Sequence, residues 1–450
     1  MALETKAQSE PFETTPQVFR NTVNEFSGRV ALRTKEFGLW HDISWETYFR
    51  QVRSVGQALI ALGLKQGECV SIIGDNCPEW VFIDMAIQSI GGVSVGVYAT
   101  NAWEQVQYVV NHCRARFLFV ENEEQLDKWL QFRGNAPSLE GVVVWDTKGL
   151  REFTDPMVAS LADLSADGRE ADTRSPELFD QRLAAGDSED VAVLIYTSGT
   201  TGPPKGAMLT HTSVTWMAGA VGRANPLSQE DAVLSFLPLC HIFERLFTVF
   251  VHIAHAYTVH FVEKADTVTD NMSEVSPTIG YAVPRIWEKY YSAVKIRMAD
   301  ATWFKRTVFR AALKIGEKWA TRRMALEPVP TWLRAAYRLA YLAVFRKLKE
   351  RLGFERMRVA YSGAAPISGE VLHFFQSIGI NLIEGYGQTE GTGVTTLSRS
   401  DAVKFGSVGT ALEGTRIRIA DDGEILIASP GVFKGYFDNP ESTADTLRHG

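Results

Sequence analysis

Short apolar runs rich in branched residues alternate with helical patterns through the first half of the chain. Between these runs lie stretches such as 45–63, whose apolar residues recur every three or four positions, as in an amphipathic helix. This alternation predicts stacked βα units around a largely parallel sheet. The apolar runs are 69–74, 93–98, 116–120 and 141–146.

Changes in residue pattern divide the chain into three parts. Residues 1–190 hold the first βα units and end in a polar connection, and residues 191–397 begin a second α/β region with the run VAVLIY. Residues 398–450 alternate tightly with Gly and Asp turns, which is typical of a small antiparallel sheet or partial barrel. The predicted fold is therefore α/β, with two stacked βα subdomains of mostly parallel strands and a small antiparallel β-barrel-like subdomain.

Composition and charge exclude several classes of protein. With 45% hydrophobic and 22% charged residues, the chain has the composition of a globular enzyme rather than a disordered protein. Its formal net charge of −7 argues against a general polyanion binder, so we expect no nucleic-acid partner. The longest charge-free apolar stretch, 246–262, holds three histidines and is predicted to be a buried helix and strand rather than a membrane span.

The cysteines and the first ten residues indicate the cellular compartment of the protein. The four cysteines form no CxxC pair and no metal-ligand spacing, which favours a reducing compartment. The first ten residues lack the apolar or arginine-rich pattern of a targeting signal. We therefore expect a cytoplasmic protein.

The stretch TSGTTGPPKG, residues 197–206, directly follows a run suited to a buried strand. Glycines let the backbone turn tightly and aim successive N–H groups inward, while hydroxyls and Lys205 add donors and charge. The spacing differs from G-x-x-x-x-G-K-[ST], because Lys205 lies three positions after Gly202 and is followed by Gly206. The stretch nevertheless predicts a phosphate-binding loop.

Five motifs in order extend this interpretation over essentially the whole chain. They are YTSGTTGPPKG (196–206), PLCHIFER (238–245), YSGAAPIS (361–368), GYGQTEGTG (385–393) and GEILIASPGVFKGY (423–436). Together they resemble the AMP-forming adenylating enzymes, which include acyl-CoA synthetases, luciferases and adenylation domains of peptide synthetases. PLCHIFER and VPRIWEKYY (283–291) are similar to the long-chain fatty acyl-CoA synthetase branch in particular.

The resemblance implies a ligase that works in two steps. The carboxylate of a long-chain fatty acid attacks the α-phosphate of ATP and releases pyrophosphate, and the thiol of CoA then displaces AMP. ATP, Mg²⁺, CoA and a long-chain fatty acid are the implied ligands. Two alternatives stay open: transfer of the acyl group to a carrier protein, and a non-catalytic sensor of acyl groups or nucleotides.

The resemblance also assigns roles to individual residues. Thr197 and Glu390 match the magnesium site, which suits a hard cation that keeps its phosphates and waters. The implied catalytic residues are Lys205, His241, Thr389 and Glu390. The residues implied to hold the phosphates are Thr197, Ser198, Gly199, Thr200, Thr201, Gly202 and Lys205.

A second group of residues is implied to hold the rest of the nucleotide. Tyr386 covers adenine opposite Gly363, Ala364 and Ala365, and Thr389 approaches the α-phosphate. The remaining members are Glu384, at the position that reads the adenine amino group, and Gly385, Gly387 and Gln388.

His241 corresponds to a family position at the junction of the substrate carboxylate and the acyl pocket. The apolar residues around it are candidates for an acyl tunnel and equally for ordinary core. They are Trp216, Phe236, Leu237, Ile242, Phe243, Val283 and Trp287.

Two long helical patterns, 303–327 and 331–353, are separated by prolines. From Lys305 to Arg351 there are thirteen Lys or Arg and three Glu, a local excess of +10. Basic helices with aromatic edges suit an anionic membrane surface, so one hypothesis is that 303–353 dock on the inner membrane face. The alternative is a solvated face above an apolar core side.

The last residues, ESTADTLRHG, depart from the family pattern. Family members continue into a segment ending in TGD, then a hinge and a small C-terminal domain with a lysine that assists adenylation. The 450 residues therefore resemble the large N-terminal domain alone, with the lysine-bearing domain absent. We expect them to bind ATP or acyl-adenylate weakly and to turn over poorly by themselves.

Overall fold

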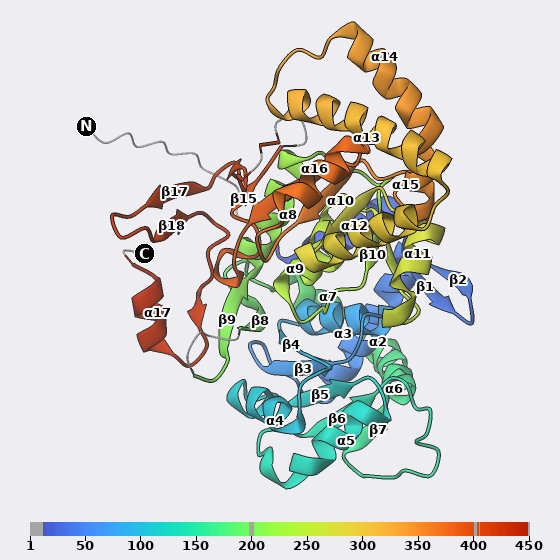
Figure 1. The fold of residues 1–450 in the computed structure, drawn as a ribbon. Coiled ribbons are helices and arrows are strands. Elements are labelled where there is room, and N and C mark those ends of the chain that lie inside the picture. Colours follow the sequence, from blue (N-terminus) through green and yellow to red (C-terminus); the bar gives the residue numbers. More distant parts are fainter. Residues whose placement is uncertain (1–11, 198–201, 400–402, 405, 449–450) are drawn as a thin grey trace.

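A computed structural model of the chain describes residues 12–197, 202–399, 403–404 and 406–448. Its largest sheet has eight strands in the order β19-β9-β8-β4-β3-β5-β6-β7 (Figure 1). The six strands from β8 to β7 pair in parallel, which confirms the predicted βα units. Their bounds are β3 (Cys69–Ile73), β4 (Val93–Val97), β5 (Phe117–Val120), β6 (Gly141–Val144), β7 (Val158–Ser160) and β8 (Val191–Thr197).

The central strands β3, β4, β5 and β8 of the large sheet are mostly apolar, as is typical of strands buried on both faces. Along β3, Val70 and Ile72 pack in one core with helices α2 and α3, while Cys69 and Ile73 pack in a second core with α4 and α5. The helices are α2 (Trp45–Ala61), α3 (Pro78–Ser89), α4 (Trp103–His112) and α5 (Glu123–Phe132). Three further helices also contribute to the first core: α1 (Thr15–Phe26), α6 (Leu161–Arg174) and α7 (Glu177–Ala184).

Two further sheets complete the α/β part. One has the order β10-β11-β1-β2, from β10 (Ala232–Ser235), β11 (Thr258–Phe261), β1 (Val30–Glu36) and β2 (Leu39–Ser44). The other has the order β12-β13-β14-β15-β16, from β12 (Ile279–Ala282), β13 (Val359–Ser362), β14 (Leu382–Tyr386), β15 (Thr396–Leu397) and β16 (Thr410–Ala411). The predicted division at residue 190 is crossed by two sheets, because β8 pairs with β4 and β1 pairs with β11.

The C-terminal part contains small antiparallel pairs of strands, as predicted. Strands β17 (Arg416–Ile419) and β18 (Ile425–Ala428) form a two-stranded ribbon with mostly exposed side chains. Strand β19 (Gly435–Tyr436) leaves this ribbon and pairs with β9 (Lys205–Thr210) of the large sheet, and α17 (Pro440–Thr446) follows. Among the described residues the strands of this part close no barrel.

The apolar stretch 246–262 is buried, as predicted. It forms a π-helical turn (Leu246–Val251), α10 (His252–His255) and β11, next to α8 (His211–Ala224) and α9 (Ile242–Arg245). Within the part of the chain that the structure describes, no helix has the length and apolar character needed to cross a membrane.

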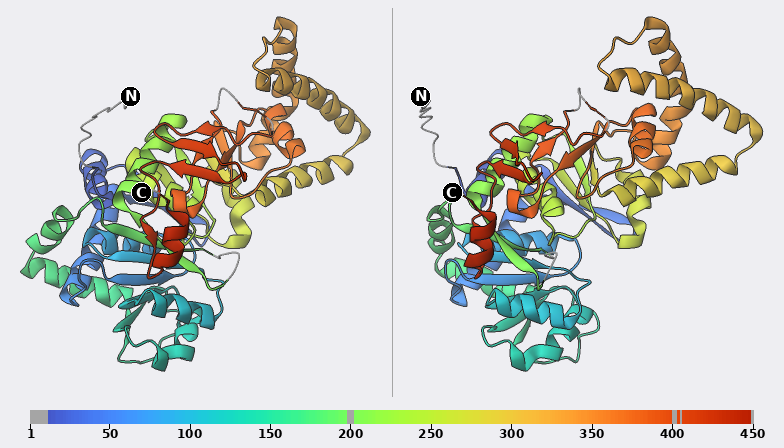
Figure 2. Two further views of the ribbon diagram at one scale, coloured as in Figure 1. Left: turned by 90° about the vertical axis from the view of Figure 1, so that its left-hand side faces the viewer. Right: turned by 60° about the vertical axis from the view of Figure 1, so that its left-hand side comes forward.

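A helical projection extends from the body of the molecule (Figure 2). It contains α13 (Trp303–Met324), α14 (Thr331–Ala340), a π-helical turn (Tyr341–Phe345) and α15 (Arg346–Leu352), which confirms the two predicted helical patterns. We call residues 303–352 the helical arm. It follows α11 (Val268–Val275) and α12 (Pro284–Ala299) and packs on α16 (Gly369–Ser377).

Candidate active site

A pocket of about 920 Å³ opens where strands of three sheets end. In α/β folds, ligands bind outside the carboxyl ends of parallel strands, where the connecting loops diverge. Each of five strands contributes a lining residue at or after its carboxyl end: Tyr98 after β4, Thr197 in β8, His241 after β10, Gly363 after β13 and Tyr386 in β14.

The pocket brings together most of the predicted site residues that the structure describes. Three predicted residues, Gly202, Ala365 and Glu384, do not line it, and Ser198, Gly199, Thr200 and Thr201 lie outside the described residues. The predicted residues that line the pocket are Thr197, Lys205, His241, Gly363, Ala364, Gly385, Tyr386, Gly387, Gln388, Thr389 and Glu390.

The β8–β9 hairpin holds the two ends of the predicted phosphate-loop segment. Thr197 and Lys205 are direct partners in its antiparallel register, so the hairpin places a hydroxyl and an ammonium group opposite each other. The Lys205 Nζ atom lies 5.2 Å from the centre of the Tyr436 ring, a cation–π contact that leaves the charge on the pocket wall.

Glu390 is tied to the C-terminal strand. The Tyr436 hydroxyl donates to Glu390 Oε1 at 2.6 Å, and the Phe433 N–H donates to the Glu390 carbonyl at 2.8 Å. Burial and the neighbouring Glu390 carboxylate raise the pKa of Tyr436, so this hydroxyl stays a donor. Sequence reasoning missed Tyr436 as a site residue, although it ends a quoted motif.

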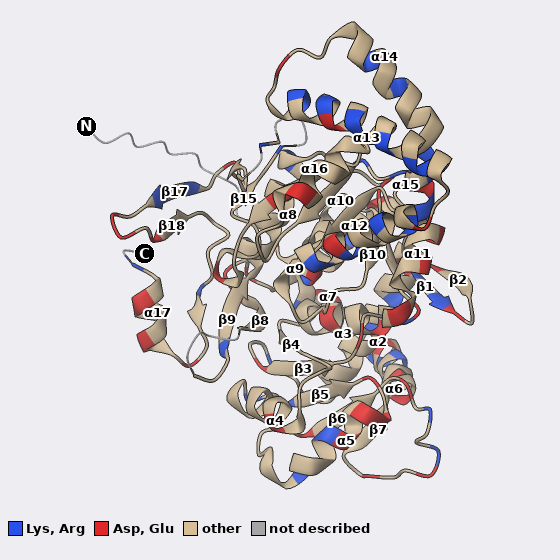
Figure 3. Cartoon of the chain, in the orientation of Figure 1, with Lys and Arg blue, Asp and Glu red and all other residues tan. Residues whose placement is uncertain are grey.

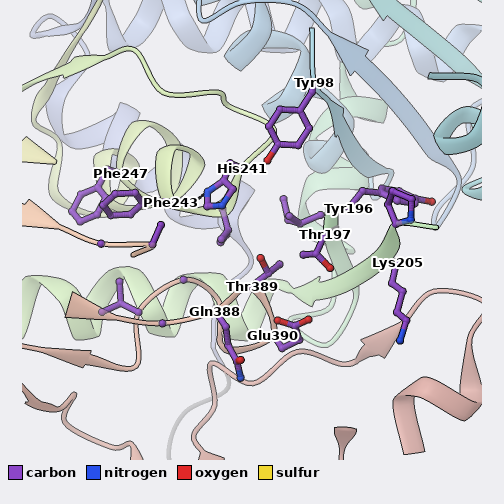
Figure 4. A pocket seen from close by; sticks show the side chains of 18 of the residues that line it. Tyr98, Tyr196, Thr197, Lys205, His241, Phe243, Phe247, Gln388, Thr389 and Glu390 are labelled. Atoms are coloured by element: carbon purple, nitrogen blue, oxygen red, sulfur yellow. Dashed lines mark hydrogen bonds between the residues drawn. The ribbon is translucent and has the colours of Figure 1, made fainter. Parts of the chain in front are cut away.

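The donor set fits Mg²⁺. Thr197 and Glu390 both line the pocket and offer one hydroxyl and one carboxylate (Figure 4). Among the residues with described positions, no cluster of three or more His, Cys, Asp or Glu could hold a metal ion. Mg²⁺ is typically bound by one or two carboxylates together with substrate phosphates and waters, so this sparse set of oxygens is sufficient.

The loop after β14 turns tightly because Gly387 lacks a side chain. A Cβ atom at Gly387 would lie 1.9 Å from the Gly393 carbonyl oxygen, and the Gly393 N–H donates to the Gln388 carbonyl at 3.0 Å. This fold-back directs Tyr386, Gln388 and Thr389 to the pocket wall. By contrast, Glu384 is buried in β14 beside Ser362, and burial raises its pKa.

His241 lies at the start of α9 in the neutral form. Its Nδ1 accepts a hydrogen bond from the Phe243 N–H at 3.1 Å, and burial lowers its pKa. Because Nδ1 is an acceptor, the ring proton is on Nε2. Figure 4 shows His241 between the group of Thr197, Thr389 and Glu390 and the rings of Phe243 and Phe247.

The pocket is aromatic beyond His241. The ring centres of Phe243 and Phe247 are 5.8 Å apart, and Tyr361 stacks on Phe247 at 5.4 Å. Of the seven tunnel candidates, only Ile242 and Phe243 line the pocket. The other candidates, which do not line it, are Trp216, Phe236, Leu237, Val283 and Trp287. The lining residues that sequence reasoning missed include Tyr98, Asn101, Glu104, Gln105, Tyr108, Tyr196, Phe247 and Tyr361.

A buried polar network supports the loop that carries His241. Glu244 is fully buried and accepts from the hydroxyls of Ser235 and Thr248, each at 2.6 Å, and from the Leu237 N–H at 3.1 Å. Burial raises the pKa of Glu244 to about 7. Asn76 holds the same loop, because its Nδ2 donates to the Leu237 carbonyl at 2.7 Å.

An ion pair lies beside this network. Arg245 and Asp84 have no exposed side-chain surface, and Arg245 Nε donates to Asp84 Oδ2 at 3.2 Å. Arg245 also donates to the Ser94 hydroxyl at 2.8 Å. The pair therefore links α9, which His241 begins, to α3 and β4 of the large sheet.

A hydroxyl, an ammonium group and a carboxylate at the strand ends of an α/β fold are groups that suit a bound nucleotide. Comparison with protein families gives the particular class: the sequence profile of the AMP-binding enzyme family matches residues 19–437. The chain belongs to this family, which confirms the resemblance seen in its five motifs.

Its curated relatives include long-chain fatty acid–CoA ligases. The chain is 32% identical to the long-chain-fatty-acid–CoA ligase ACSBG2 of Xenopus laevis over 97% of this chain and 60% of that protein. It is 34% identical to ACSBG2 of Homo sapiens over 96% of this chain and 65% of that protein. The chain thus spans slightly under two thirds of the length of these relatives.

Solved structures share the fold. The anthranilate CoA ligase AuaEII in complex with anthranoyl-AMP matches 98% of this chain and 73% of its own, with a TM-score of 0.72 and 21% identity. The N-terminal domain of FACL13 from Mycobacterium tuberculosis matches 98% of this chain and 94% of its own, with a TM-score of 0.68 and 19% identity. These likenesses confirm the α/β architecture.

Proposed function

We propose that this chain forms the ATP-binding and acyl-binding part of a long-chain fatty acid–CoA ligase that works through an acyl-adenylate. The observation that carries the proposal is that a single pocket joins Thr197, Lys205 and Glu390 to an aromatic end at Phe243 and Phe247. The ligase names of the ACSBG2 relatives support the acyl class.

In the first step, a carboxylate oxygen of the fatty acid bonds to the α-phosphorus of ATP. The bond from that phosphorus to the bridging oxygen breaks, and pyrophosphate leaves. Little covalent chemistry falls to the protein, so positioning and charge neutralisation dominate. In this proposal Lys205 neutralises phosphate charge, Thr389 contacts the α-phosphate, and Tyr386 covers adenine opposite Gly363 and Ala364.

His241 and the magnesium residues act at the reacting groups. Neutral His241 donates from Nε2 to a substrate carboxylate oxygen, which orients the other oxygen toward phosphorus. Mg²⁺, held by Thr197 and Glu390, would supply positive charge to the phosphates. The Tyr436 hydroxyl keeps the Glu390 carboxylate in place on the pocket wall.

In the second step, the sulfur of CoA bonds to the acyl carbonyl carbon, and AMP leaves with the electrons of the broken C–O bond. The thiol proton passes to solvent. A carrier protein offers the same pantetheine thiol as CoA. The identity of the acyl acceptor therefore distinguishes a CoA ligase from an enzyme that loads a carrier protein.

The test is ATP-dependent pyrophosphate release across fatty acids of increasing length, with CoA, with a pantetheinylated carrier protein, or with neither. We expect slow release that rises with acyl length, and slow formation of acyl-CoA when CoA is present. Lys205→Met should lower kcat/KM by roughly 10²-fold, because the phosphates lose a fixed positive charge. Lys264→Met, at an exposed lysine outside the pocket, is the matched control.

Two outcomes would overturn the proposal. Preference for short or aromatic carboxylates over long acyl chains would exclude the fatty acid class. Failure to bind either Mg·ATP or a non-hydrolysable acyl-adenylate analogue in calorimetry would exclude the adenylation site itself.

A further inference from the structure

The helical arm presents apolar side chains to the outside. Seven of the seventeen large hydrophobic residues that are exposed in the described structure belong to this segment of 50 residues. A soluble surface normally carries such residues singly, so a concentration of them marks an interaction site. The seven are Trp303, Phe304, Val308, Leu326, Trp332, Leu339 and Leu342.

Helix α14 and the turn after it have two apolar sides. On one side Leu333 and Ala340 are buried. On the other side Trp332, Leu339 and Leu342 are 62%, 70% and 63% exposed, and their spacing of seven and three residues places them along one side of the helix. The inward side already provides packing, so the outward apolar side is not needed to hold the arm on the body.

The same segment carries a dense positive charge. Its thirteen Lys or Arg and three Glu give +10, whereas the whole chain has −7. Figure 3 shows the basic residues following α13, α14 and α15, with few acidic residues between them. Within the described residues, the only salt bridge of the arm joins Arg322 to Glu327, so most of these cations have no acidic partner in the protein.

We propose that the helical arm is a docking surface for an anionic lipid bilayer. Exposed tryptophans and leucines enter the boundary between headgroups and acyl chains, and the arginines and lysines beside them contact anionic headgroups. Charge complementarity favours this occupant over a second copy of the chain, because an arm of +10 would face another arm of +10 in a symmetric dimer.

The position of the arm links this surface to the pocket. Helix α13 packs closely on α16, because a Cβ atom at Gly316 would lie 2.5 Å from the Ser377 carbonyl oxygen. Helix α16 lies between β13 and β14 in the chain, and these two strands supply Gly363 and Tyr386 at the pocket. Docking through the arm would therefore hold the pocket at a fixed height above the bilayer.

The test is co-sedimentation of the chain with vesicles, without ATP or fatty acid, so that its result does not depend on the proposed ligase activity. We compare phosphatidylcholine vesicles with mixed phosphatidylcholine–phosphatidylserine vesicles at low and high salt. The charge variant is Arg334→Gln, Arg338→Gln, Arg346→Gln, and its matched control is Arg151→Gln, Arg169→Gln, Arg418→Gln, at arginines that are also exposed.

A second variant tests the apolar contribution. It is Trp332→Ser, Leu339→Ser, Leu342→Ser, and its matched control changes three exposed apolar residues elsewhere: Phe37→Ser, Leu39→Ser, Ile419→Ser. Circular dichroism and thermal unfolding establish that every variant is folded. Because all the changed side chains are at the surface, folding should be retained.

We expect binding to the anionic vesicles that weakens with salt. The charge variant should lower the vesicle partition coefficient by at least about tenfold, and the apolar variant should lower it similarly, while both controls bind like the parent. Absence of binding to any vesicle, or arm variants that bind as well as the parent, would overturn the proposal. The proposal would also be overturned if ultracentrifugation shows that the parent chain forms a dimer without lipid and that the apolar variant does not. The exposed side of the arm would then bind a second copy of the chain.

Discussion

The buried polar groups around α9 and the helical arm differ in how they use charge. Around α9, Arg245 and Asp84 are fully buried as a pair, and Glu244 accepts hydrogen bonds from four donors. In the arm, most cations are exposed, and Arg322 with Glu327 is the only salt bridge among its described residues. Polar groups around α9 hold the protein's own loops in place, whereas charges on the arm face outward and contribute little to the fold.

The largest effect should come from breaking the buried pair. Arg245→Met leaves the Asp84 carboxylate buried without its partner, which costs about 3–5 kcal/mol of unfolding free energy. Arg338→Met removes an exposed arginine of the arm and should change stability by less than about 0.5 kcal/mol. Urea unfolding of the two variants measures the difference.

The double variant Asp84→Leu, Arg245→Met separates charge from packing. It should recover part of the loss, because no unpaired charge remains in the core. If Arg245→Met and Arg338→Met lower the free energy of unfolding equally, the comparison between the two regions is contradicted.

The second-largest effect should be a pH dependence of stability that Glu244 causes. Its pKa is about 7 in the folded protein and 4.5 in its ordinary state, so the folded protein binds one more proton than the unfolded chain between these values. Its contribution to the free energy of unfolding is therefore fully present below pH 4.5. This contribution, on the order of 3 kcal/mol, is lost as pH rises through 7. Glu244→Gln should remove this decline.

Thermal unfolding of the parent and of Glu244→Gln from pH 5 to pH 8 checks the sign. The stability of the parent relative to the variant should fall as pH rises across this range. The exposed acid Glu327 in the arm provides the control, since Glu327→Gln should leave the pH profile unchanged. A parent that gains stability relative to Glu244→Gln with rising pH would show that the carboxylate is ionised when folded.

The third effect concerns how the arm is attached. Gly316→Val places side-chain atoms where a Cβ alone would lie 2.5 Å from the Ser377 carbonyl oxygen. Overpacking of this kind costs about 1–3 kcal/mol. Gly369→Val is the matched control on α16, since a Cβ there meets nothing within 4 Å. Gly316→Val should have a lower unfolding free energy and a more protease-sensitive arm than Gly369→Val. Equal results for the two variants would show that α13 is loosely held.

Much of the site was predictable because its residues are local in sequence. Thr197 and Lys205 flank one glycine-rich segment, and Tyr386 to Glu390 form a single short loop, so motifs capture them together. The helical arm was also predictable, because its charge and its prolines are read directly from the chain.

Other features depend on contacts between distant segments, which local patterns do not specify. Strand β19 pairs with β9 across more than 200 residues, and the local alternation of the C-terminal part does not indicate this partner. Of the predicted tunnel residues, Trp287 packs against Phe375 in the core, with ring centres 5.5 Å apart, because apolar side chains suit a core and a tunnel equally. Phe247 and Tyr98 reach the pocket from elements whose sequences carry no functional signal.

The smallest effect tests the residue that long-range pairing brought to the site. Tyr436→Phe removes the hydroxyl that donates to Glu390 Oε1 at 2.6 Å but keeps the ring beside Lys205. The loss of one hydrogen bond to a carboxylate should cost about 1 kcal/mol of unfolding free energy, and the less constrained Glu390 should raise the Mg²⁺ concentration needed for half-maximal pyrophosphate release. Tyr98→Phe, at a second tyrosine of the pocket, is the control for unfolding free energy. If both substitutions lower the unfolding free energy equally, or if the Mg²⁺ requirement does not change, then Tyr436 contributes only packing. The polar contacts that stabilise the region around α9 would then have no counterpart at the pocket wall.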